Sequence, residues 1–124
     1  MPFASFVARV ELEKREFKLK GTFTLGARSN GIHPLTEDVT LQVGAFAATI
    51  PAGSLRSHGH DTFRFEGVAR GAALEVEIRS RGGGRFEFKA EGNGAQVGTA
   101  NPVTVRLTIG DDAGSTLAKV KVHD

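Results

Sequence analysis

The clearest chemistry lies in a histidine-rich segment, Ser57-His58-Gly59-His60-Asp61. In an extended chain His58 and His60 share one face, with the Asp61 carboxylate beside them, and imidazole and carboxylate groups are ligands for zinc. A stable site needs a third and a fourth ligand held by further hydrogen bonds. The candidates to complete such a site are His33, His123 and Asp124. We therefore interpret the segment as a polar loop tip and keep His58, His60 and Asp61 as candidate metal ligands.

Two acidic pairs, Glu37-Asp38 and Asp111-Asp112, are candidates for calcium binding because calcium takes carboxylate and carbonyl oxygens. Neither loop supplies the several oxygens that such a site needs. Asp is also common in turns, where its side chain bonds nearby backbone groups. Asp111 and Asp112 stay as candidate ligands beside this turn interpretation, and we predict no cofactor.

The sequence predicts no catalytic residues. Cysteine is absent, which excludes thiol catalysis and disulfides. Ser54 and Ser57 lack the G-x-S-x-G context of a nucleophile elbow. The glycines at 82–84 precede a strand pattern and not a helix, so they do not form a phosphate-binding loop. We expect a protein that is not an enzyme.

Charge and composition restrict the partners. The 124 residues include 16 Lys and Arg against 14 Asp and Glu, a net charge of +2 that is too small and too mixed to indicate nucleic acid. No apolar run approaches the length of roughly 18 residues that a membrane helix needs. Nine Phe occur without Trp or Tyr, the rings that keep a polar tip in water, so the rings are expected in the core.

The elements that must position these residues are strands. Apolar residues alternate with polar ones in most of the chain, as in Val103, Val105, Leu107 and Ile109. Such segments have one buried and one wet face. We predict a single domain over residues 1–124, an antiparallel β-sandwich of about eight strands, either Ig-like or jelly-roll-like.

Turn residues divide the strands. Arg70-Gly71 and the glycines at 82–84 predict two hairpins, and residues 110–114 predict another. The apolar phase flips between Leu12 and Phe17 and again at Gly44-Ala45, where we expect bulges or bends. Residues 26–37 and 51–61 show no period, and long loops of this kind are where a binding site is expected.

The N-terminal segment up to residue 13 is apolar on one face and ends in the charged tetrad Glu13-Lys14-Arg15-Glu16. The tetrad holds no Gly, Pro, Asn or Asp and is therefore a poor tight turn. Such a strand is either an ordinary first strand of its own sandwich, since sequential strands usually pair, or an assembly strand that completes the sheet of a neighbouring copy. The residues of this assembly strand are Phe3, Phe6, Val7, Ala8, Val10 and Leu12.

Several short motifs resemble a bacterial module that is widespread in predicted secreted or surface proteins and has no settled function. They span about residues 17–122 and are Gly21-Thr22-Phe23-Thr24-Leu25-Gly26, Asn30-Gly31-Ile32-His33-Pro34, Ile50-Pro51-Ala52-Gly53-Ser54, Asn101-Pro102-Val103-Thr104 and Ile109-Gly110-Asp111-Asp112. The resemblance implies an all-β module at the cell surface or outside the cell, and it brings no catalytic residues. The start Met1-Pro2-Phe3 lacks the features of a secretory leader, so the leader was removed or the protein stays inside the cell.

Taken together, these patterns predict a non-enzymatic structural or assembly module, with a fibre subunit joined by its N-terminal strand as the specific form. The expected partner is a second copy of the chain. The alternative is a glycan-binding module that uses the loops 26–37 and 51–61.

Overall fold

The alternating segments form strands in the computed structural model, which describes residues 2–13, 15–27, 29, 31–94, 97–98 and 101–123, and only the backbone of residue 123. No helix occurs in these residues. The strands are β1 (Ser5–Glu13), β2 (Glu16–Thr24), β3 (Val39–Val43), β4 (Phe46–Ile50), β5 (Arg56–Ser57), β6 (Thr62–Ala69), β7 (Ala72–Gly82), β8 (Arg85–Asn93), β9 (Val103–Ile109), β10 (Asp112–Ala118) and β11 (Val120–His123).

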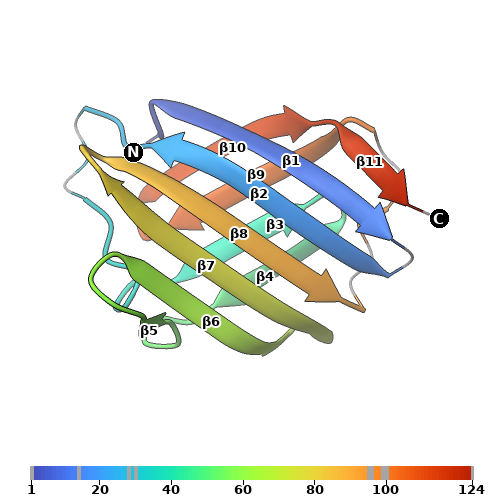
Figure 1. Ribbon diagram of the computed structural model, residues 1–124, viewed down its shortest axis with the longest axis horizontal. Helices are drawn as coiled ribbons and strands as arrows, with labels where there is room; N and C mark the ends of the chain where they lie inside the picture. Colours follow the sequence, from blue (N-terminus) through green and yellow to red (C-terminus); the bar gives the residue numbers. More distant parts are fainter. Residues whose placement is uncertain are drawn as a thin grey trace.

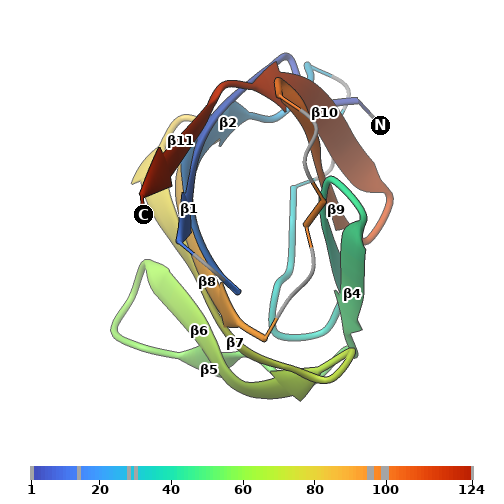
Figure 2. The same cartoon turned by 90° about the vertical axis from the view of Figure 1, so that its right-hand side faces the viewer.

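The strands make two sheets that pack face to face, as Figures 1 and 2 show. One sheet has seven strands in the order β11-β1-β2-β8-β7-β6-β5, and the other has four in the order β10-β9-β3-β4. Every pairing is antiparallel except that of β1 with β11. The predicted all-β sandwich is confirmed. Its described part has eleven strands instead of about eight, because β5 is very short and β10 is a polar strand whose sequence shows little alternation.

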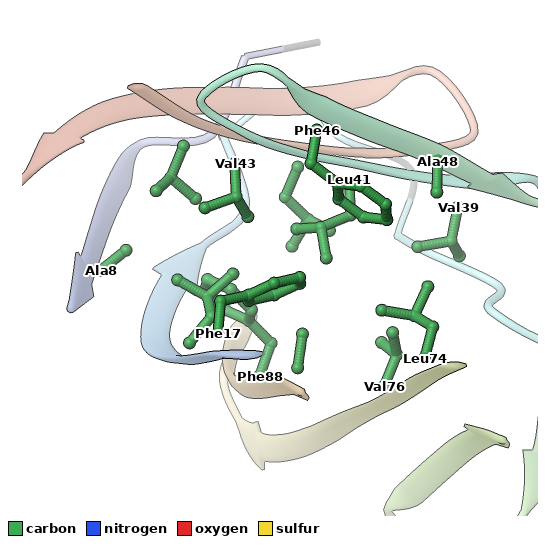
Figure 3. Packing of buried hydrophobic residues seen from close by; sticks show 14 of the residues in the cluster. Ala8, Phe17, Val39, Leu41, Val43, Phe46, Ala48, Leu74, Val76 and Phe88 are labelled. Atoms are coloured by element: carbon green, nitrogen blue, oxygen red, sulfur yellow. The ribbon is translucent and has the colours of Figure 1, made fainter. Parts of the chain in front are cut away.

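The core lies between the sheets and is built from the inward residues of both. Val39, Leu41 and Val43 of the small sheet face Phe17, Leu74 and Phe88 of the large one, and all are buried (Figure 3). Two of these rings cover glycines on the neighbouring strand: Phe17 is paired with Gly92, and Phe88 with Gly21. A side chain at either glycine would collide with the ring. Some of the Phe and Gly residues therefore occur as cross-strand pairs, in which the ring fills the space above the glycine.

Two of the predicted glycine turns are confirmed, and the third, predicted for residues 110–114, is limited to Gly110 and Asp111 because β10 begins at Asp112. Arg70 and Gly71 connect β6 to β7, both with positive φ (54° and 76°), as two-residue hairpins of the favoured type require. Gly83 and Gly84 connect β7 to β8 in the same way, with φ of 64° and 77°. Strands β6, β7 and β8 therefore form a three-stranded meander.

Both phase flips were predicted wrongly as bulges or bends. Glu13 pairs with Glu16, and Val43 pairs with Phe46, so each flip is a two-residue hairpin. In such a hairpin the paired residue numbers have a constant odd sum, so the buried face moves from even to odd positions across β1–β2 and from odd to even across β3–β4. Nine paired residues with apolar inner faces stabilise the β1–β2 hairpin although its connection lacks a favoured turn residue.

Candidate functional site

The two long loops converge at one end of the sandwich, on the left in Figure 1. Each connects the large sheet with the small one, and Asp38 links them. Its side-chain Oδ1 accepts a hydrogen bond from the N–H of Ala52 (2.8 Å), and its carbonyl accepts one from the N–H of Gly110 (3.0 Å). The loops 26–37 and 51–61 therefore form one surface together with the β9–β10 turn.

The acidic side chains at this end bind the loops themselves. Glu37 Oε1 accepts the N–H of His33 at 2.6 Å, and its other oxygen packs against Gly110. The carboxylate of Asp112 is fully buried, and its Oδ2 accepts a hydrogen bond from the Ser29 hydroxyl at 3.0 Å. The Glu37 contact is local, as in a turn, whereas Asp112 binds a side chain that is distant in the sequence.

Asp112 Oδ1 differs from these oxygens, because it is buried and has no hydrogen-bond partner among the described residues. Asp111, its neighbour, is exposed in the turn. Across the described part of the chain, no three His, Asp or Glu side chains lie close enough together to hold a metal ion. The candidate ligands at 111 and 112 therefore share this end of the fold with Glu37 without forming such a cluster.

The histidine segment is an exposed loop tip between β5 and β6. His58, His60 and Asp61 are all exposed. The backbone orders the tip: the N–H of His58 donates to the Thr62 carbonyl (2.7 Å), and the Asp61 carbonyl accepts from the N–H of Ser80 (2.8 Å). The candidate partner His33 is exposed in the other loop, while Asp124 and the side chain of His123 lie outside the described residues.

The N-terminal strand lies inside the large sheet and not at its edge. All nine residues of β1 pair with β2, and its last four also pair with β11 in parallel (Figure 2). Ala8 and Val10 are buried, Phe3, Phe6 and Leu12 pack against the core, and Val7 is 61% exposed. In this single chain the segment is thus held by its own sandwich.

The residues before β1 bind the other sheet. The N–H of Phe3 donates to the Ala113 carbonyl of β10 (2.8 Å), whereas the N–H of Ala4 donates to Thr24 of β2 (2.8 Å). The Phe3 ring stacks on Phe23 at a centroid distance of 4.5 Å and lies against Gly114. The N-terminal segment therefore ties the two sheets together along one side of the sandwich.

The outer face of the large sheet carries a feature that the sequence analysis missed. Arg9 pairs with Lys20, and Lys20 pairs with Lys89, so three cations stand side by side on β1, β2 and β8. We call these three residues the basic row. They surround a shallow hollow of about 450 Å³, and none of them forms a salt bridge with another described residue. The β2–β8 pairing joins distant parts of the chain, so no local pattern signals the row.

The same face also carries acidic groups. Glu66 pairs with Glu75 and Glu75 with Glu91, which places three carboxylates side by side on β6, β7 and β8. Nearby, Arg81 Nη2 lies 2.7 Å from Glu87 Oε2, and this hydrogen bond holds the pKa of Glu87 below its usual value. Both rows also contain the opposite sign, since Lys89 pairs with Glu77 on its other side and Glu91 pairs with Lys18.

Comparison with protein-family models, curated protein sequences and solved structures gave no match to this chain. The described residues include no helix with the length and apolar character needed to cross a membrane.

Proposed function

We propose that this chain is a non-enzymatic structural or assembly module of a bacterial surface or extracellular structure, and that copies join by exchanging their N-terminal strands. The observation that supports the proposal is the position of residues 2–13. They fill a slot between β2 and β11 and also bond to β10, so they contact both sheets. A strand with this position completes the sandwich, whether it comes from the same chain or from another.

Strand exchange requires few contacts that the single chain does not already make. A neighbour's segment in the same slot would make the same backbone hydrogen bonds and bury the same side chains, as in domain swapping. The closed and exchanged forms then differ mainly in the connection between β1 and β2. The sequence between the paired Glu13 and Glu16 is Lys-Arg, whereas favoured hairpin turns contain Asn-Gly or Asp-Gly. This unfavourable connection favours the form in which the hairpin opens.

Deletion of residues 1–13 tests the proposal. We expect the full chain to form high-mass species and the deletion to abolish them, and unchanged assembly would refute strand donation. Because the deletion also exposes the core, a second variant is needed that keeps the strand.

The K14N/R15G variant supplies this test, since Asn-Gly stabilises the closed β1–β2 hairpin. We expect it to remain folded and to lose the high-mass species. R70N is the matched control because it creates the same dipeptide in the β6–β7 turn, where the left-handed backbone (φ 54°) already suits Asn. Equal assembly of both variants would contradict the proposal.

A glycan-binding role remains the second candidate, and the convergence of the two long loops supports it. Asp38 holds both loops in one surface, and loops on a rigid scaffold often carry binding sites. A glycan array with the intact protein is the test. A signal that is lost in H58A/H60A and in L35A would favour this role, and no signal for the intact protein would refute it.

A further inference from the structure

The four outer strands of the two sheets are protected unequally against pairing with other chains. An open strand edge is a template for another strand, and proteins protect edges with charges, shortness or covering segments. The edge of β10 is covered by Pro2 and Phe3. Strand β5 has two residues, and β11 is short and carries the exposed Lys121. Strand β4 carries no charged residue, and no described strand pairs with its outer edge, although β6 lies near it at the corner of the sandwich.

The backbone directions show which groups of β4 are open. The N–H of Gly44 donates a hydrogen bond to the Thr104 carbonyl, and this pair continues the β3–β9 register. The backbone N–H and C=O groups of the even-numbered β3 residues therefore bond to β9. Those of the odd-numbered residues bond to β4. Their partners on β4 are Phe46, Ala48 and Ile50. The N–H and C=O groups of Ala47 and Thr49 therefore point away from β3, and no described residue pairs with them.

The side chains around this edge favour a second copy as the partner. From Gln42 to Leu55 the chain has no charged residue, so two copies approach without electrostatic repulsion. The outward side chains Ala47 and Thr49 are exposed and small. In an antiparallel pair centred on Ala48, residue 47 of one copy lies opposite residue 49 of the other. The same strand thus supplies both halves of a symmetric contact, as a two-fold interface requires.

We propose that β4 is a self-association edge at which two copies join their four-stranded sheets into one continuous antiparallel sheet. Ala47 of each copy exchanges both backbone hydrogen bonds with Thr49 of the other. The contact is short, so the dimer is transient and depends on concentration. The inference rests on the proposed assembly function and adds to it a second interface that uses no residue of β1.

Sedimentation equilibrium over a concentration series tests the edge with the variants T49P and T49V. Proline removes the outward N–H, which the monomer does not use, and proline is tolerated at edges of this kind. Valine keeps the N–H and removes only the hydroxyl that lies 3.0 Å from Thr40 Oγ1. We expect the dimer dissociation constant to rise about tenfold or more in T49P, since a bond is lost in each copy, and to stay close to wild type in T49V.

Hydrogen exchange gives an independent readout. The amides of residues 47 and 49 should exchange quickly in dilute solution and slowly at high concentration, whereas the amides of 46, 48 and 50 should be protected at both. Wild-type self-association that persists unchanged in T49P but is lost in K14N/R15G would overturn the β4 proposal and leave strand exchange standing. A wild-type chain that is monomeric at every concentration would overturn both.

Discussion

Phe3 is the side chain whose removal tests most directly how the N-terminal segment is held. Its ring stacks on Phe23 at 4.5 Å with an interplanar angle of 19° and meets Phe6 edge-on at 5.8 Å. It also fills the space above Gly114, where a side chain would collide with it. The F3A variant removes these contacts and leaves the backbone bond to Ala113 in place.

The expected cost follows from burial. Truncating a fully buried Phe to Ala costs about 3–5 kcal/mol, and aromatic pairs add about 0.5–1.5 kcal/mol. Phe3 is half-buried, so we expect F3A to lower the free energy of unfolding by about 2 kcal/mol. With an unfolding entropy of about 2.1 cal/mol/K per residue, the melting temperature should fall by about 8 °C.

Thermal unfolding of F3A, G114A and the double variant measures this effect. G114A alone should destabilise by about 1–3 kcal/mol because its methyl group meets the ring, and most of that cost should vanish in the F3A background. V7A is the matched control, since Val7 is on the same segment but 61% exposed, and its cost should stay below about 0.5 kcal/mol. A cost of F3A no larger than that of V7A, or an equal cost of G114A in both backgrounds, would refute the reasoning.

Three further outcomes are expected. G92A should lower the free energy of unfolding by about 1–3 kcal/mol, because its methyl group meets the buried ring of Phe17. Denaturant unfolding measures this loss, and adding F17L to G92A should restore part of it. K20T should raise the melting temperature at low salt, because Lys20 stands between Arg9 and Lys89. The gain in melting temperature should shrink as added salt screens the repulsion. An equal gain at all salt concentrations would contradict this prediction. The pKa of Glu87 is lowered in the folded state by Arg81, so its contribution to stability is present above the unfolded pKa and is lost as the pH falls through the folded pKa. An E87Q variant should show a smaller loss of stability in acid than wild type, by thermal unfolding across pH.

The sequence was sufficient for most of the strands, β5 and β10 excepted, and for the two glycine turns of the β6–β7–β8 meander. Alternation reports burial on one face of a strand, and turns such as Arg70-Gly71 need the left-handed backbone that glycine adopts freely. The β1–β2 turn was misinterpreted because its residues carry no such signal. Its stability comes from pairing along the whole hairpin, which residue preferences at the turn do not express.

The candidate site was less predictable, because it depends on which distant strands are neighbours. The basic row requires β8 to lie beside β2, and nothing local to Lys20 or Lys89 indicates that pairing. The buried position of Asp112 depends likewise on the loop that brings Ser29 to it. In contrast, the convergence of the two long loops follows from the strand directions, since both leave strands that end on the same side.

The central claim is that copies of this chain associate through their strands. The most direct test is the solution mass of the full chain, measured by size-exclusion chromatography with light scattering over a wide concentration range. The account predicts species heavier than the 13.2 kDa monomer that grow with concentration and decline in K14N/R15G. A single species of 13.2 kDa at every concentration would contradict it.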